Sequence, residues 1–315
     1  MQTSNGGSRE VASDVATTSP LDKPPVDVDS AKNTLRVAVL LCLVCSVLVS
    51  VFAVALKGTQ DRNKQEFLRK NVLQAAGIWS EDSKVDDESF GKLSQALVYN
   101  FETHQAREDA DAVKLIDVET DSKNPEKSDK IVDDVAGIKR REKETIIYKV
   151  TVDGSQIVVL PVRGYGLWST LWGFIALDVS DAKTAGPESI VVKGLTYFDQ
   201  KETPGLGGEV DNPLWKQKWI GKKVFDENWN VKAKVTKGAE GLYEVDAISG
   251  ATITSRGVTN MLSYWLGDEG FGPYLRELGG APPAGPPEEH NGHDDDDDKH
   301  QEAGEDDHGQ EKKNG

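Results

Sequence analysis

The segment Val37–Leu56 constrains the fold of this chain more than any other feature. Its 20 residues, VAVLLCLVCSVLVSVFAVAL, carry no charge and are apolar apart from two serines. As an α-helix the segment is about 30 Å long, which matches the hydrocarbon thickness of a bilayer. A cleavable signal peptide is the alternative, but its apolar core is shorter, roughly 7–15 residues, and lies near the start of the chain. We therefore predict one transmembrane helix at residues 36–57, preceded by a disordered arm at residues 1–33.

The net charge of the 315-residue chain is −16, and much of this charge lies at the C-terminal end. Residues 280–315 begin with GAPPAGPP and contain twelve acidic residues against three lysines. This composition buries too little apolar area to offset the entropy lost on ordering, so we predict an acidic, disordered tail. The negative charge of the whole chain also argues against a nucleic-acid-binding protein.

Between the membrane segment and the tail, the pattern of apolar residues changes from helical to β-type. Helical spacing continues from Phe67 to Ala76, and a further helix is expected at Phe90–Phe101, with loops elsewhere between residues 80 and 144. Two β-branched runs, at 146–152 and 155–162, flank the hairpin signal Asp153-Gly154. Further strands are expected at 172–178, 189–199, 231–235 and 242–248, and helices at 255–266 and 273–278. These elements predict an α+β domain at residues 58–279 with a mainly antiparallel sheet and flanking helices.

The predicted domain lacks the residues on which many enzymes depend. It contains one histidine, His104, and no cysteine, because Cys42 and Cys45 both lie in the membrane segment. A Ser/His/Asp hydrolase, a Cys/His enzyme and a His-rich metal centre are therefore not expected. No P-loop is present, and the glycines of GLGGEV lack the strand-then-helix arrangement that binds a dinucleotide. We expect neither NADH nor a metal ion to bind this chain.

The segment DAISGATITS, residues 246–255, places small hydroxyl residues between a strand end and a helix. Free amide N–H groups and the positive end of the helix dipole make such a position favourable for a phosphate. The residues alone favour a plainer interpretation, in which Thr252, Thr254 and Ser255 only cap the helix.

DAISGAT resembles the flavinylation motif Asp-x-x-Ser/Thr-Gly/Ser-Ala-Thr of bacterial FMN-binding domains, whose last threonine carries FMN through a phosphoester bond. Three other segments, GYGLWSTLWGFIAL (164–177), KETPGLGGEV (201–210) and YWLGDEGFGPYL (264–275), are similar to the NqrC family of the Na⁺-translocating NADH:quinone oxidoreductase. The resemblance covers residues 35–278 and implies a covalent FMN on Thr252, next to Ser249, Gly250 and Ala251.

The resemblance implies flavin contacts for two further groups of residues: Thr203, Gly205 and Leu206, and Leu167, Trp168 and Ser169. In the first group, Pro204 and Gly205 favour a turn from which Leu206 offers an apolar face to the flavin ring, and a plain surface turn is the alternative. The second group follows a Gly-Tyr-Gly break and either lines the flavin site or starts the next strand.

By this resemblance, the chain is an electron-transfer component of a six-subunit, Na⁺-pumping complex in the bacterial cytoplasmic membrane. Electrons from NADH, oxidised elsewhere in the complex, pass through the FMN toward ubiquinone. Two alternatives are the singly anchored, FMN-bearing component of an Rnf-type ferredoxin:NAD⁺ oxidoreductase and a cofactor-free membrane-anchored scaffold.

The resemblance and the charge pattern disagree on the orientation of the chain. In the family, a separate Mg²⁺-dependent flavin transferase installs FMN outside the cytoplasmic membrane, which implies that the C-terminal domain, with its FMN-binding part at about 145–279, is on the periplasmic side. Five basic residues follow the membrane segment within 15 positions and three precede it, which weakly favours the reverse. Because charge counts predict less reliably when a large domain is translocated, we expect the periplasmic orientation.

Overall fold

The described residues begin with one long helix, and a six-stranded sheet forms the centre of the domain that follows. The computed structural model describes residues 30–79 and 86–281, and the chain divides into two compact units at Lys64. Helix α1 (Ala31–Ala75) includes residues of both units. Within residues 30–79 and 86–281 it is the one helix long and apolar enough to cross a membrane, and its most apolar stretch has a mean hydropathy of 3.0 with no residue buried.

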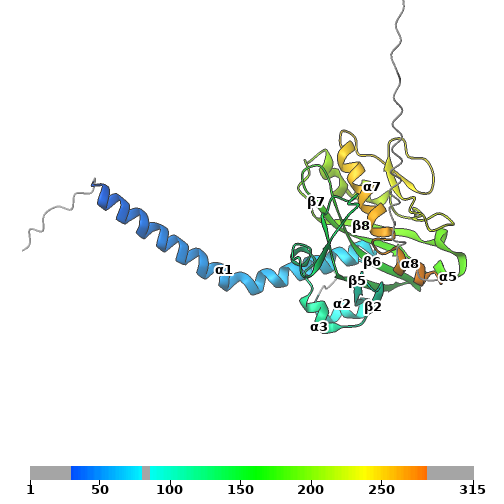
Figure 1. Ribbon diagram of the computed structural model, residues 1–315, viewed down its shortest axis with the longest axis horizontal. Helices are drawn as coiled ribbons and strands as arrows, with labels where there is room; N and C mark the ends of the chain where they lie inside the picture. The colour runs from blue at the N-terminus through cyan, green and yellow to red at the C-terminus, as the bar shows by residue number, and fades with distance from the viewer. Residues whose placement is uncertain (1–29, 80–85, 282–315) are drawn as a thin grey trace, which may run out of the picture. The chain divides into compact units, whose positions relative to one another are not determined.

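A six-stranded antiparallel sheet forms the centre of the second unit, with the strand order β2-β1-β5-β6-β7-β8 (Figure 1). Its strands are β1 (Ser94–Asn100), β2 (Gln105–Arg107), β5 (Glu144–Val152), β6 (Ser155–Tyr165), β7 (Thr170–Asp178) and β8 (Val191–Asp199). The expected hairpin is confirmed: β5 and β6 are joined through Asp153 and Gly154, both with positive φ, as a tight two-residue turn requires. The expected α+β class with a mainly antiparallel sheet is likewise confirmed.

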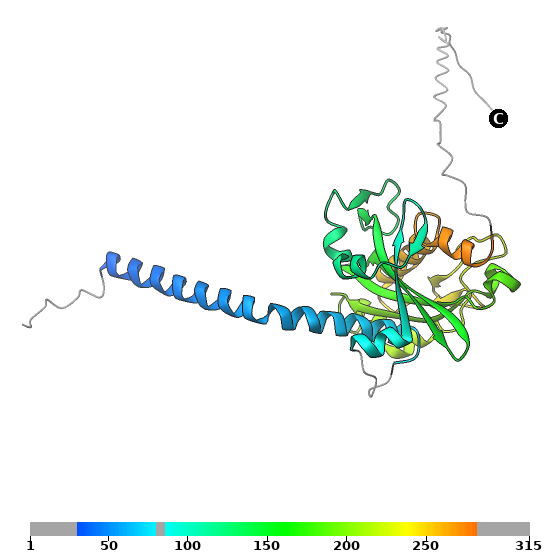
Figure 2. The same cartoon turned by 90° about the horizontal axis from the view of Figure 1, so that it is seen from below.

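Alternate residues of the central strands point to opposite faces of this sheet and form two separate cores. On one face, Ile157 and Val159 of β6 pack with the last turns of α1, including Val72 and Leu73. On the other face, Val158 and Leu160 belong to the larger core, which also contains side chains of α7 (Thr252–Leu266) and α8 (Gly272–Leu278). Figures 1 and 2 show the last turns of α1 on one side of the sheet and α7 and α8 on the other.

The expectation for residues 80–144 is wrong in two respects. Helix α2 (Asp87–Leu93) ends early, and the rest of the predicted helix is strand β1, because Val98 pairs with Ile146 of β5 and cross-strand packing outweighs the helical spacing. The expected loops contain further short elements: β2, α3 (Ala110–Leu115), α4 (Val118–Asp121), β3 (Ser128–Lys130) and β4 (Arg140–Glu142).

Short elements connect β8 to the C-terminal helices. They are η2 (Gly207–Asp211), α6 (Pro213–Gln217), β9 (Lys234–Thr236) and β10 (Glu244–Asp246), whereas α5 (Ala182–Ala185) and η1 (Pro187–Ser189) lie between β7 and β8. The strands expected at 231–235 and 242–248 are thus only three residues long, and they pair in parallel. This pairing places the end of β10, and with it the start of α7, beside β9.

Helix α7 lies very close to the end of β6. A side chain at Gly257 would overlap the carbonyl oxygen of Tyr165, so only glycine permits this approach. Further along the helix, the indole Nε1 of Trp265 donates a 2.6 Å hydrogen bond to the carbonyl oxygen of Arg163. The helix is therefore fixed to the strand that leads into the loop at residues 166–169.

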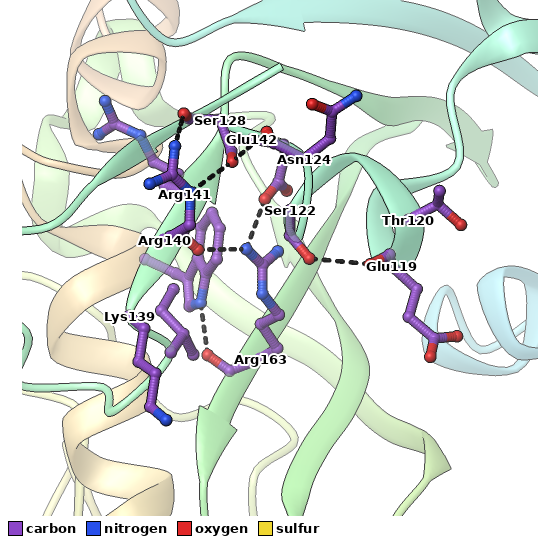
Figure 3. A network of polar contacts seen from close by, with 12 residues as sticks. Glu119, Thr120, Ser122, Asn124, Ser128, Lys139, Arg140, Arg141, Glu142 and Arg163 are labelled. Carbon is purple, nitrogen blue, oxygen red and sulfur yellow. Dashed lines mark hydrogen bonds and ion pairs between the residues drawn. The ribbon is translucent and has the colours of Figure 1, made fainter. Parts of the chain in front are cut away.

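A buried ion pair supports the same strand end (Figure 3). The guanidinium of Arg163 lies 2.6 Å from a carboxylate oxygen of Glu142, donates to the Arg140 carbonyl oxygen at 3.0 Å, and is 5.1 Å from the ring centres of Trp172 and Trp265. Both charged side chains are almost fully buried. Removing one partner of such a pair leaves an isolated buried charge and costs about 3–5 kcal/mol.

Candidate cofactor site

Thr252 is the first residue of α7 and is exposed. The helix cap is Ala251, and no side chain makes a capping hydrogen bond, so the cap-only interpretation of the hydroxyl residues does not describe this helix. The turn before it depends on Gly250, whose φ of +73° is left-handed, and a Cβ atom there would lie 2.9 Å from Cδ2 of Leu206. Leu206 therefore packs directly against the turn that precedes Thr252.

The other two hydroxyl groups in the first turn of α7, those of Thr254 and Ser255, already make hydrogen bonds within the protein. Thr254 is 1% exposed and donates a 2.7 Å hydrogen bond to Oε2 of Glu202, and Ser255 is 3% exposed and accepts one from the amide of Ile248. Ser249 is exposed, in the turn before the helix. Of the two threonines in the first turn, only Thr252 presents its hydroxyl to an incoming group.

A cleft of about 590 Å³ opens beside Thr252. One wall comes from β9 and the residues after it, and the other from the turn before α7 and its first two turns. The cleft is lined by Val235, Thr236, Lys237, Ala247, Ile248, Ser249, Gly250, Thr252, Ser255, Arg256 and Thr259. Among the described residues, its only charged side chains are thus two cations, Lys237 and Arg256, and both are exposed.

Glu202 connects the three segments that the sequence singled out. Its carboxylate accepts hydrogen bonds from the amides of residues 167, 168 and 169, at 2.9–3.2 Å, and from the Thr254 hydroxyl. The Glu202 side chain is closely packed against Gly207. A Cβ atom at Gly207 would lie 2.6 Å from both the Glu202 carboxylate and the Thr254 hydroxyl oxygen. One carboxylate therefore holds the β6–β7 loop, the ETPGLG turn and the start of α7 together.

The charge of Glu202 is stabilised by these donors. Burial alone would raise the pKa of the carboxyl group, but the hydrogen bonds from Thr254 and from the amides of residues 167–169 outweigh burial and hold this pKa below its ordinary value. Glu202 is 5% exposed and is thus a buried anion at neutral pH.

Exposed apolar side chains lie on the loops that Glu202 joins. Leu167 and Trp168, the latter 67% exposed, come from the β6–β7 loop, and Leu206 from the turn after β8. Ser169 accepts a hydrogen bond from the Lys201 amide at 2.8 Å, which further ties these two loops. Ile253 adds an exposed apolar side chain from α7 itself.

The predicted site residues fall into two groups in the structure. Ser249, Gly250 and Thr252 line the cleft, and Ala251 is buried beside them. The others, Leu167, Trp168, Ser169, Thr203, Gly205 and Leu206, do not line it but belong to the loops joined through Glu202. Thr203 and Gly205 are exposed parts of a turn in which the Thr203 carbonyl oxygen accepts from the amides of Leu206 and Gly208.

Sequence reasoning missed three residues of this region: Glu202, Lys237 and Arg256. Glu202 directly precedes the residues selected from KETPGLG, and an acidic residue within an apolar and glycine-rich turn was a usable signal. Arg256 lies one helical turn after Thr252, so helical spacing pointed to it. Lys237 had no local signal, because its position depends on the pairing of β9 with β10.

Comparisons with known proteins agree with this geometry. Residues 166–267 match the family described as FMN-binding domain, a range that contains the loop at 167–169, Glu202 and Thr252. The fold and the matched segment thus define the chain as an FMN-binding domain protein.

Relatives of known name specify the family further. The chain is 43% identical to the NqrC component of the Na(+)-translocating NADH-quinone reductase of Haemophilus ducreyi, over 78% of this chain and 94% of that protein, and 38% identical to that of Yersinia pestis, over 82% and 96%. The crystal structure of Shewanella oneidensis NqrC matches with a TM-score of 0.62 and 32% identity, covering 70% of this chain and all of that one. The chain belongs to the NqrC family of the Na⁺-translocating NADH:quinone reductase.

Proposed function

We propose that this protein carries FMN as a phosphoester on Thr252 and passes electrons within a Na⁺-translocating NADH:quinone reductase. The single observation that supports Thr252 as the attachment site is the contrast between two threonines. Thr252 is exposed at the cleft, whereas Thr254 is buried and donates a hydrogen bond to Glu202. The names of the relatives favour this reaction over that of an Rnf-type oxidoreductase. The FMN-binding family favours it over a cofactor-free scaffold.

The residues present fit FMN by their chemistry. An exposed hydroxyl at a helix start, next to two cations, suits a phosphate, and exposed apolar side chains on adjoining loops suit a flavin ring. Gly250 and Gly207 leave room where a Cβ atom would meet Leu206 or Glu202. When bound, the flavin supplies the acceptance and release of electrons.

The protein's own residues bind and orient this group. Thr252 provides the oxygen that bears the phosphate, and Ser249 and Gly250 shape the turn on which it stands. Leu167, Trp168 and Leu206 provide apolar surface for the ring and exclude water from one of its sides. Glu202 does not itself bind the flavin; it holds the loop of residues 167–169 at a fixed position relative to α7.

The family supports a proposal on partners and location. A reductase component of this kind works in a multi-subunit complex, and the single apolar helix α1 fits a single-pass membrane protein. We propose that α1 anchors the chain in the cytoplasmic membrane with the sheet domain on the periplasmic side, where a flavin transferase attaches the FMN. The other five subunits of the six-subunit Nqr-type complex, including one that oxidises NADH, would complete the electron path.

In-gel flavin fluorescence after denaturation tests the proposal. The full-length protein, co-expressed with the transferase, should give a fluorescent band at its own mass, because a covalent flavin survives denaturation. A dark band from protein co-expressed with an active transferase would contradict the covalent flavin and favour the scaffold.

A further inference from the structure

Two cations in the cleft lack the partners that their neighbours have. The chain contains eight basic residues between positions 216 and 256. Six of them have an acceptor for the side-chain nitrogen: Lys216, Lys218, Lys222, Lys223, Lys232 and Lys234. Within the described ranges, the remaining two, Lys237 and Arg256, have neither an ion pair nor a side-chain hydrogen bond, and both line the cleft beside Thr252.

Both cations line the same cleft as Thr252, and they come from its two different walls. Arg256 follows Thr252 by four residues in α7, so the two side chains lie on the same face of the helix, one turn apart. Lys237 comes from the opposite wall, which a hydrogen bond of 2.9 Å from the Val235 amide to the Thr259 hydroxyl fastens to α7. No acidic residue of the described ranges lines this cleft. The nearby Asp246 is already bonded, to Lys218 at 3.7 Å and to the amide of Ala239.

We propose that Arg256 and Lys237 form a cationic subsite that holds the phosphate of the flavin on Thr252. This inference rests on the proposed function, since it assigns partners to the phosphate of that same site. The planar guanidinium of Arg256 suits two parallel hydrogen bonds to phosphate oxygens, and Lys237 supplies a point charge from the other wall. The phosphate then lies on the cleft side of Thr252, which leaves the ring on the side of Leu206 and Trp168.

The ³¹P resonance of the flavin-loaded, full-length protein tests this subsite directly. In a phosphate-free buffer and detergent, the protein should show one phosphodiester resonance. Arg256→Gln and Lys237→Gln should each shift it, because each removes a charged donor, and Arg256→Lys, which keeps the charge, should shift it less than Arg256→Gln. The matched control is Lys234→Gln, which removes an exposed lysine three residues from Lys237 that is paired with Glu244 outside the cleft. It should leave the resonance in place.

Flavin loading gives a second measurement on the same variants. We expect the double variant Arg256→Gln/Lys237→Gln to load FMN roughly tenfold more slowly than the control, because charge-assisted hydrogen bonds to the phosphate are lost. A folded double variant that loads no flavin also supports the subsite, provided that Lys234→Gln loads normally. Unchanged loading together with an unchanged resonance in all variants would overturn it. If the wild-type protein itself shows no phosphodiester resonance, the proposed attachment is wrong, which is a separate failure.

Discussion

The hydroxyl group of Thr254 donates a 2.7 Å hydrogen bond to the carboxylate of Glu202, across 52 positions of the chain. The same carboxylate accepts three amide hydrogens from the β6–β7 loop. This pair therefore links the helix that begins at Thr252 to the loop that carries Trp168. It also occupies the Thr254 hydroxyl, which would otherwise compete with Thr252, the proposed acceptor of the flavin phosphate.

Replacing Glu202 should destabilise the domain and loosen the flavin site. Glu202→Ala leaves three partly buried amides and the buried Thr254 hydroxyl without their acceptor, which we expect to lower the free energy of unfolding by about 3 kcal/mol. Denaturant unfolding measures this loss, and flavin fluorescence anisotropy reports on mobility at the site. Glu88→Ala, which removes an exposed carboxylate from α2, is the control and should change the stability by less than about 0.5 kcal/mol. Equal stabilities of the two variants would show that Glu202 holds nothing in place.

Glu202 should also contribute to the pH dependence of stability. Because its pKa is lower in the folded protein than its ordinary value of 4.5, the unfolded state binds the proton more readily. The contribution is fully present above pH 4.5 and is lost as the pH falls through the lowered folded-state pKa. Melting temperatures measured from pH 7 down to pH 3 should thus fall less steeply for Glu202→Gln than for the wild type. A Glu202→Gln curve parallel to the wild-type curve would mean that this carboxyl group is not stabilised in its ionised form.

Thr252→Val should abolish the covalent flavin and leave the domain folded. The substitution removes the proposed acceptor oxygen, roughly preserves the side-chain volume, and affects an exposed position, so we expect a stability change within about 0.5 kcal/mol. Thr254→Val should keep the flavin but lose about 1 kcal/mol, because Glu202 loses one donor. In-gel fluorescence and thermal unfolding measure both effects. Retained flavin in Thr252→Val and lost flavin in Thr254→Val would move the attachment site by two residues.

The central strands were predictable from sequence because their signal is local. β-branched runs on both sides of Asp153-Gly154 define β5, β6 and their turn without reference to the rest of the chain. Strand β1 was not predictable in this way, since its residues 94–100 also fit a helical spacing and only the pairing with β5 decides their conformation. The short strands β9 and β10 depend similarly on each other.

The candidate site was predictable only where a motif is continuous. Thr252 was identified within seven consecutive residues, and its exposure at the start of α7 agrees with the proposed role. Glu202, by contrast, gains its importance from donors at residues 167–169 and 254, which become neighbours only after folding. Hydrophobic periodicity and composition do not report hydrogen bonds between segments that are distant in the chain. Residues that act through such hydrogen bonds therefore cannot be identified from these two properties.

The orientation of the domain can be decided by labelling. We expect residues after α1 on the periplasmic side, because the flavin transferase of the family works there, although five basic residues just after the apolar segment favour the reverse. The protein for this test carries Glu126→Cys, a change at an exposed position, with Cys42 and Cys45 replaced by alanine so that the new thiol is the only one. An impermeant thiol reagent should label it in intact spheroplasts as completely as after lysis. Labelling only after lysis would place the domain in the cytoplasm, and the charge pattern would then have predicted the topology better than the family resemblance.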